Sequence, residues 1–333
     1  MRPADIRINE QAGQHESIVL ALLAIAEAGG MTLDYDDLCA AMGLSFTAVS
    51  TTAEPSPGWW LTFGRDVFVE PVGERFGFRL RNLHPPDVGV DMLGADEFPQ
   101  HFEISYKPLI CRALENDQPV LAWQGWADDR WPHWGVITAV QSDALLGVTL
   151  GGEEGLVPLT NPAMQCYVVE AYEPTEVPRD QLFALAMASA DGYMNRGVLN
   201  PTVDDVRKPR VVTGPAGFDA WEHWLTTEIE NDDAWYEHVH HAQRVCASRK
   251  SARRFLKKSL EFLSPKQRET VIDAIDCCDD LLTHLETSCD DEVVQDAFAA
   301  KHGRDPLLEA VHAAEGADRR LAIRIEELHA ATR

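Results

Sequence analysis

Near the start of the chain, apolar residues recur at helical intervals and then give way to strand-like runs. The spacing predicts one helix over residues 18–26, which two glycines end, and a second helix over residues 35–42. Between residues 50 and 105 the apolar runs are short, as in DVFVEPV and GFRLRNL, and Pro- and Gly-rich loops separate them. This part of the chain is therefore expected to combine helices with strands.

A helix followed by antiparallel strands is predicted for the middle of the chain. The helix covers residues 104–116 and ends at a Gln-Pro pair. Strand-like runs follow it, in the order VLAWQGW, HWGVITAV, LLGVTL and CYVVEAY. Beyond Arg179 helical spacing continues to the end of the chain, apart from a short VVTG run. We therefore predict an α+β domain over residues 1–176 and an all-α domain over residues 177–333.

Composition narrows the class of protein further. No apolar run approaches the ~18 residues that a membrane span needs, and the N-terminus lacks a signal-peptide layout. Seven cysteines form no C-x-x-C pair, which favours reduced thiols and a cytoplasmic protein. The formal net charge of −25 argues against nucleic-acid binding. No dinucleotide, Walker-type or G-x-S-x-G motif is present, so no cofactor is expected.

Three segments together resemble a known group of proteins. They are the helix QAGQHESIVLALLAIAEAGG, the passage ALENDQPVLAWQGW and the strand PHWGVITAV. With them the chain resembles bacterial papain-like proteins, namely the bacteriocin-processing-type cysteine peptidases and the N-terminal domain of the butirosin-biosynthesis acyltransferase and its relatives. The resemblance implies a papain-like domain, with an N-terminal helix packed on an antiparallel sheet, ahead of the helical domain.

The resemblance also assigns candidate catalytic positions. A papain-like site needs a thiolate at a helix N-terminus, an imidazole on the sheet, an Asp or Asn that orients it, and a side-chain amide for the oxyanion. His133 matches the imidazole and Gln11 the amide. The cysteine of the family falls at Glu16 or Ser17, and neither residue is cysteine. Residues 149–151 stand where the orienting acid belongs, and none of them is Asp or Asn.

The missing thiol leaves two functions open. In the first, the domain has lost its chemistry and remains a binding or structural module. In the second, it is an active acyltransferase, amidase or peptidase in which Ser17 or Glu16 works with His133. A third role for Ser17 is to cap the helix, which would give its hydroxyl no part in chemistry. Asp143, the nearest acid to the orienting position, lies in a turn before it.

Tryptophan is concentrated around the candidate histidine. Trp123, Trp126, Trp131 and Trp134 lie within one short stretch. Core packing explains one or two of them, whereas a half-exposed cluster is typical of a pocket or an interface. We predict a Trp-rich pocket for a small molecule or peptide, with His15 and Glu16 at its mouth. Residues 128–130 either add polar selectivity or form a solvated turn.

The helical half carries a basic stripe in an acidic protein. Arg249, Arg253 and Lys257 recur at four-residue spacing on one predicted helix. By analogy with the acyltransferase, the stripe would bind an acidic carrier protein. Alternatively, it pairs with the acidic runs at 228–233 and 273–280. The helical half is expected to cover one face of the first domain or to mediate self-association as a homodimer.

Histidines and a cysteine in the helices give weaker candidates. His238, His240 and His241 could bind a metal with His223 or His284, but no H-E-x-x-H signature is present. We therefore expect no metal and exposed helix histidines. Cys39 lies on an apolar helix face and is predicted to be a buried core residue.

Overall fold

The computed structural model describes residues 2–9, 13–51, 69–83, 96–127, 133–150, 155–196, 211–227, 233–300 and 303–333. The chain groups into two compact units. The first unit comprises Met1–Tyr35 and Phe68–Val177, and the helical unit comprises Asp36–Val67 and Pro178–Arg333. Residues 36–67 thus group with the helical half. A compact unit need not coincide with a domain in the sequence, so the boundary after residue 176 stays a prediction.

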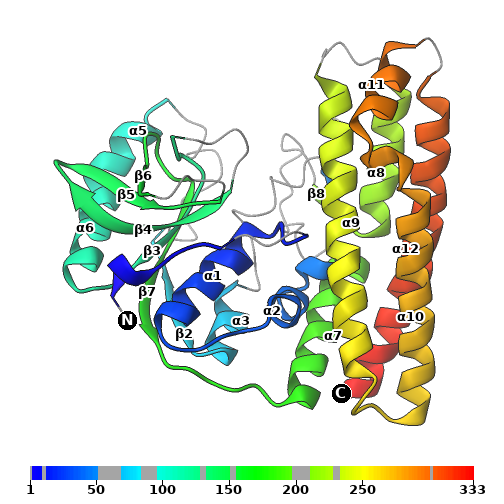
Figure 1. Ribbon diagram of the computed structural model, residues 1–333, viewed down its shortest axis with the longest axis horizontal. Helices are drawn as coiled ribbons and strands as arrows, with labels where there is room; N and C mark the ends of the chain where they lie inside the picture. The colour runs from blue at the N-terminus through cyan, green and yellow to red at the C-terminus, as the bar shows by residue number, and fades with distance from the viewer. Residues whose placement is uncertain are drawn as a thin grey trace. The chain divides into compact units, whose positions relative to one another are not determined.

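An antiparallel sheet forms the frame of the first unit, which confirms the α+β class (Figure 1). Its six strands lie in the order β2-β7-β3-β4-β5-β6. Their bounds are β2 Phe78–Asn82, β3 Val120–Trp123, β4 Trp134–Gln141, β5 Ala144–Val148, β6 Val157–Pro158 and β7 Gln165–Tyr172. In the described residues, the helical segments of this unit are the 3-10 turn η1 Pro3–Asp5, α1 Ser17–Ala28, α3 Val69–Arg75, α5 Phe98–His101, the π-turn η4 Phe102–Tyr106 and α6 Lys107–Glu115.

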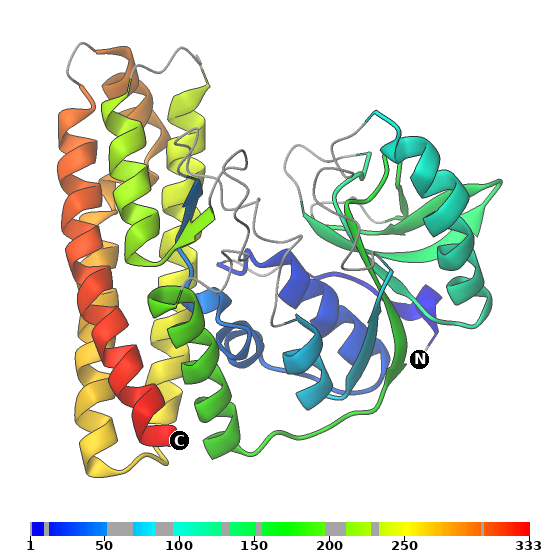
Figure 2. The ribbon, with the colours of Figure 1, turned by 180° about the vertical axis from the view of Figure 1, so that it is seen from behind.

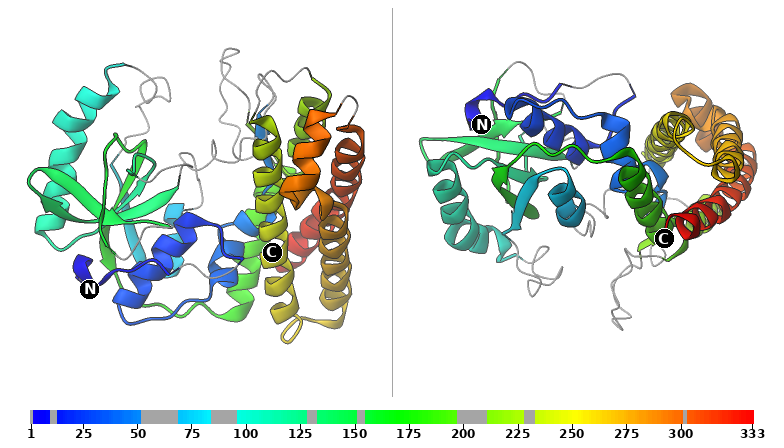
Figure 3. Two further views of the ribbon diagram at one scale, coloured as in Figure 1. Left: turned by 45° about the horizontal axis from the view of Figure 1, so that its top comes forward. Right: turned by 90° about the horizontal axis from the view of Figure 1, so that it is seen from below.

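Helices cover the sheet from two sides. Helix α1 is apolar almost all round and nearly wholly buried, as expected of a helix inside a core. It packs on β4, whereas α6 contacts β3, β4 and β7. Figure 3 (right) shows α1 and α6 on opposite faces of the sheet. The strands between them therefore bury side chains in both directions, which explains why VLAW and WGVIT read as continuous apolar runs.

The face toward α6 has its own core. Alternate residues of β3, including Val120 and Ala122, join Ile137 from β4 and Cys166 from β7 in one buried cluster with α5, η4 and α6. Side chains alternate between the faces of a strand. The residues between them, such as Trp123 and its cross-strand partner Trp134, therefore point to the α1 face.

Two sequence predictions in this unit need correction. The run DVFVEPV was expected to be a strand, but Val69–Arg75 form helix α3, because a short apolar run fits either element and the packing decides. The helix predicted over 104–116 begins earlier, at Phe98, and passes through the π-turn η4 before it ends at Glu115. Strand β2 occupies the GFRLRNL run as predicted.

Long helices make up most of the helical unit (Figures 1 and 2). The described helices are α2 Tyr35–Ala41, whose first residue is grouped with the first unit, α7 Arg179–Asn195, α8 Pro215–Thr226, α9 Ala234–Ser259, α10 Pro265–His284, α11 Asp291–Ala299 and α12 Asp305–Thr332. Two 3-10 turns, η2 Leu44–Phe46 and η5 Thr287–Cys289, and a two-stranded ladder of β1 Val49–Thr51 with β8 Val211–Thr213 complete it. Helices α8, α9, α11 and α12 enclose a core built around Trp221 and Trp224.

A buried ion pair ties three elements of this unit together. Arg249 of α9 and Asp318 of α12 are both 0% exposed, and the guanidinium approaches the carboxylate at 2.6 Å. Arg249 also donates to the backbone carbonyls of Ser45 and Thr47. Burial raises the pKa of Asp318, and the adjacent guanidinium opposes that shift. Within the described residues, no helix is both long and apolar enough to cross a membrane.

Candidate functional site

The start of helix α1 meets the strand that follows His133. The hydroxyl of Ser17 accepts a hydrogen bond of 3.0 Å from the backbone N–H of Trp134. Ser17 is the first residue of α1 and is 5% exposed, while Glu16 occupies the N-cap without a side-chain capping bond. The alternative that Ser17 caps its own helix is therefore wrong. Its hydroxyl joins α1 to β4 instead.

The strand register explains why Trp134 needs this acceptor. Gln124 N donates to His133 O, so the next pair along, Trp123 and Trp134, sits at a non-hydrogen-bonded position of the β3–β4 ladder. The N–H of Trp134 then points away from β3, toward the side of β5. Strand β5 ends at Val148, opposite Val136, and stops short of Trp134. Ser17 supplies the acceptor that the strand does not.

A tyrosine holds the backbone just before α1. The hydroxyl of Tyr35 accepts from His15 N at 3.2 Å and from Glu16 N at 3.0 Å. Glu16 is 5% exposed and His15 is half-buried. Two of the N–H groups that precede the helix are thus already engaged by a side chain of the same unit. Tyr35 was not foreseen, because it belongs to a separate helix about twenty residues away.

Trp123 and Trp134 form the centre of the α1-facing surface of the sheet. They lie opposite each other on β3 and β4 and are 6% and 0% exposed. The ring of Tyr167 on β7 lies 5.9 Å from that of Trp134, and Gln165 donates to the Tyr167 hydroxyl at 2.7 Å. Neither indole N–H has a hydrogen-bond partner among the residues that the structure describes. Buried donors normally have one.

The prediction for Trp126 needs correction. It was expected to line the same pocket as Trp123 and Trp134, but it is 2% exposed and belongs to the core on the α6 side. Its ring covers Gly135 and Gly147, where a Cβ would lie within 2.7 Å of ring atoms. Its indole N–H approaches the carbonyl of Ala122 at 3.4 Å. Trp126 is thus core packing on the other face of the sheet.

Several candidate residues fall outside the described part of the chain. They are Gln11, Trp131 and the polar residues at 128–130, so the predicted oxyanion amide and the rest of the predicted pocket stay predictions. His133 is half-buried, directly before β4. Asp143 lies in the turn after the far end of β4 and pairs with Lys107 at 3.1 Å. About 25 Å of strand separates that turn from the histidine end of β4, so Asp143 is placed too far away to orient His133.

The basic stripe of α9 does not form one exposed surface. Arg249 is 0% exposed and bonded to Asp318, so it cannot contact a carrier protein as predicted. Arg253 is half-buried and pairs with Asp279, whereas Lys257 is exposed. The pairing of Arg253 with Asp279 follows the alternative, in which the stripe meets the acidic run at 273–280. Arg249 faces Asp318 of α12, Arg253 faces Asp279 of α10 and Lys257 is exposed, so the three side chains do not share one surface.

Two of the helix histidines are buried rather than exposed. His238 and His241 are 0% and 1% exposed, and both rings pack against Trp221. The indole N–H of Trp221 donates to Nδ1 of His238 at 3.2 Å, which requires a neutral imidazole. Burial lowers the pKa of each histidine to about 3. Cys39 is also buried, at 0% exposure, as predicted.

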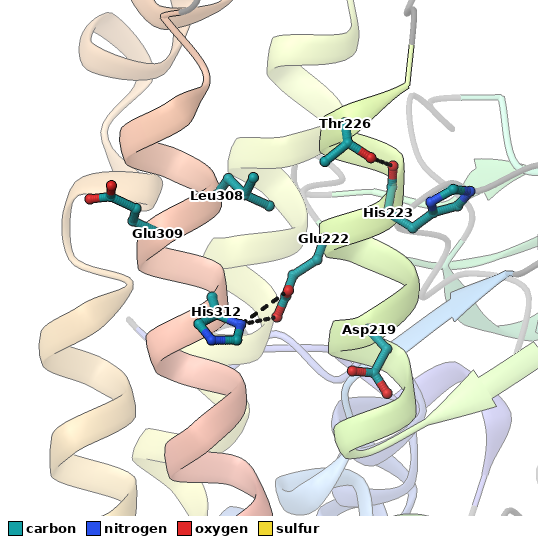
Figure 4. Close-up of a pocket in the computed structure, with 7 residues that line it drawn as sticks. All are labelled: Asp219, Glu222, His223, Thr226, Leu308, Glu309 and His312. Carbon is teal, nitrogen blue, oxygen red and sulfur yellow. Dashed lines mark hydrogen bonds and ion pairs between the residues drawn. The ribbon is translucent and has the colours of Figure 1, made fainter.

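A cavity of about 470 Å³ lies between α8 and α12 of the helical unit (Figure 4). Its lining is mainly acidic and imidazole groups, from Asp219, Glu222, His223, Thr226, Leu308, Glu309 and His312. Figure 4 shows Glu222 and His312 directed at each other, and His223 pointing away from them. Glu222, His312 and Glu315 bring ligand atoms within 4.8 Å of one another. Glu315 already bonds Arg319, and His312 lies 3.2 Å from Glu222, so each of these groups already has a partner within the unit.

Comparison with known proteins does not assign the chain to a family. No protein-family model matches the chain, and no curated protein matches it either.

Proposed function

We propose that the first unit is a papain-like domain that has lost thiol chemistry and acts as a binding or structural module. The observation that carries this proposal is the hydrogen bond from Trp134 N to the Ser17 hydroxyl. It brings the first residue of α1 next to the residue that follows His133, which is the juxtaposition a papain-like site uses. It also engages the hydroxyl at a position where the family has its cysteine.

The contacts of Ser17 oppose a nucleophilic role. A serine nucleophile must present its oxygen to the substrate and pass its proton to a base that a third group orients. Here Ser17 is 5% exposed and its oxygen accepts a backbone N–H. Asp143 is held at the other end of β4, and the Tyr35 hydroxyl already accepts the backbone N–H groups of His15 and Glu16 just before α1. These features favour a structural role for Ser17.

The two indoles support binding at the same end of the sheet. Trp123 and Trp134 keep buried N–H donors without an acceptor in the described residues. Leaving a buried donor unpaired costs roughly 1–3 kcal/mol, so an acceptor is favoured there. A small molecule or peptide with a carbonyl or carboxylate oxygen fits this requirement. We therefore assign the acceptor of these two indole N–H groups to such a ligand.

Fluorophosphonate labelling of the whole chain separates this proposal from an active enzyme. Fluorophosphonates bond covalently to activated serine hydroxyls, so we expect no labelling of Ser17 under conditions that fully label a serine hydrolase control. Stoichiometric labelling that disappears in both Ser17→Ala and His133→Ala would overturn the proposal.

The structural role of Ser17 has its own readout. Ser17→Ala leaves the N–H of Trp134 without its acceptor and should lower the free energy of unfolding by about 1–3 kcal/mol. Tyr35→Phe removes the acceptor of two N–H groups and should cost a similar amount. Urea unfolding measures both. An unchanged stability in Ser17→Ala would show that the hydroxyl does not join the two elements.

A further inference from the structure

Two cysteines from different elements meet in the helical unit. Cys246 lies on α9, and Cys289 is the last residue of the turn η5, 43 positions later. Their sulfur atoms are 3.5 Å apart. A disulfide bond measures about 2.0 Å, so bond formation requires the sulfurs to approach by roughly 1.5 Å.

The backbone on both sides of Cys289 is fixed against α9. Gln243, one turn before Cys246, donates to the carbonyl of Cys289 at 3.1 Å. Directly after Cys289, the carboxylate of Asp290 caps α11 by accepting from Glu292 N and Val293 N. The approach of the two sulfurs is therefore part of how η5 and α11 pack on α9.

The two thiols differ in exposure and acidity. Cys246 is 5% exposed, whereas Cys289 is half-buried. The hydrogen bond with the Cys246 thiol lowers the pKa of Cys289, and the Lys250 ammonium lowers it further, against the effect of burial. The same hydrogen bond, with burial, raises the pKa of Cys246. Because Cys289 is the more accessible thiol and its pKa is shifted downward, it is the thiol that reacts with an oxidant first.

We propose that a peroxide oxidises the thiols of Cys246 and Cys289 to a reversible disulfide bond. The Cys289 thiolate attacks one oxygen of hydrogen peroxide, the O–O bond breaks, and hydroxide leaves and takes up a proton to become water. Cys289 is then a sulfenic acid. The Cys246 sulfur attacks the Cys289 sulfur, the S–O bond breaks, and a second water leaves with the thiol proton. Two thiols and one peroxide thus give one disulfide and two waters.

The disulfide would join α9 to the segment that leads into α11. It closes a long loop that includes the whole of α10, so it restricts the unfolded chain and resists local opening of η5 and α11. We therefore expect the oxidised protein to melt at a higher temperature than the reduced protein. Dithiothreitol should reverse both the bond and the shift.

Peptide mapping of the full-length chain tests the proposal directly. Reduced protein is treated with hydrogen peroxide, its remaining thiols are alkylated, and it is digested without reductant. We expect an intact-mass loss of about 2 Da before alkylation and one linked peptide pair containing Cys246 and Cys289. Oxidation that leaves these two thiols alkylated, or that links other cysteines in their place, would overturn it. This readout needs no variant to fold.

Single variants test the order of events. In Cys246→Ser the resolving thiol is absent, so dimedone should trap a sulfenic acid on Cys289. In Cys289→Ser no disulfide should form, and dimedone should not label Cys246. Cys277→Ser, which removes a buried thiol of α10, is the matched control and should keep the linked peptide pair. Equal dimedone labelling of Cys246 in Cys289→Ser would contradict the assignment of Cys289 as the attacked thiol.

Discussion

Mild acid should weaken the helical unit through two buried histidines. His238 and His241 pack against Trp221 and are almost fully buried. Nδ1 of His238 accepts the indole N–H of Trp221, and in the described residues neither nitrogen of His241 has a hydrogen-bond partner. A proton on either ring would place a charge in this aromatic core. It would also break the bond that His238 accepts.

The sign and the size of the effect follow from the pKa shifts. Burial lowers both pKa values from 6.5 to about 3, so below pH 6.5 the unfolded chain binds protons that the folded chain does not. The cost is absent above about pH 6.5 and grows as the pH falls toward about 3. At about pH 5 each histidine costs roughly 2 kcal/mol, or about 4 kcal/mol for the pair.

Urea unfolding of wild type and His241→Phe, at about pH 8 and about pH 5, tests this reasoning. Phenylalanine keeps an aromatic ring against Trp221 and removes the titrating nitrogens. The stability lost between the two pH values should shrink by about 2 kcal/mol in His241→Phe. His284→Gln removes an exposed histidine of α10 as the control and should keep the wild-type loss. An equal loss in wild type and His241→Phe would refute the argument.

Two further predictions concern packing. Arg249→Met leaves the buried carboxylate of Asp318 unpaired and should cost about 3–5 kcal/mol of stability, whereas Arg253→Met, at a half-exposed pair, should cost no more than about 1 kcal/mol. Equal losses of unfolding free energy in the two variants, measured by urea unfolding, would show that burial of the ion pair does not determine its contribution. Gly147→Ala puts a methyl group 2.2 Å from a backbone oxygen and should lower the melting temperature. Gly316→Ala on α12, where the methyl group meets only the end of the Arg320 side chain at 4.0 Å, should raise it slightly. A melting temperature that Gly147→Ala leaves unchanged would show that β4 and β5 can move apart.

The apolar pattern of the sequence predicted helices and strands well where nearby residues determine them. The helix expected over 18–26 is α1, and the run HWGVITAV covers β4 except for its last residue, because their apolar spacing is strong and uninterrupted. The run DVFVEPV was misjudged as a strand, since its length and pattern fit a short helix equally well. Predictions about residues whose partners lie far away in the sequence were less accurate. The four-residue spacing of Arg249 and Arg253 could not reveal that only Arg249 faces Asp318, 69 positions away.

The candidate site shows the same dependence on distant structure. The sequence predicted the strand LLGVTL to run through Leu150, but β5 ends at Val148. By the register Val136↔Val148, Leu150 would have stood opposite Trp134, where its carbonyl could accept the Trp134 N–H. Two residues more of strand would thus have released the Ser17 hydroxyl from its bond to β4. The point at which β5 ends therefore decides whether the Ser17 hydroxyl joins α1 to β4 or remains available for chemistry.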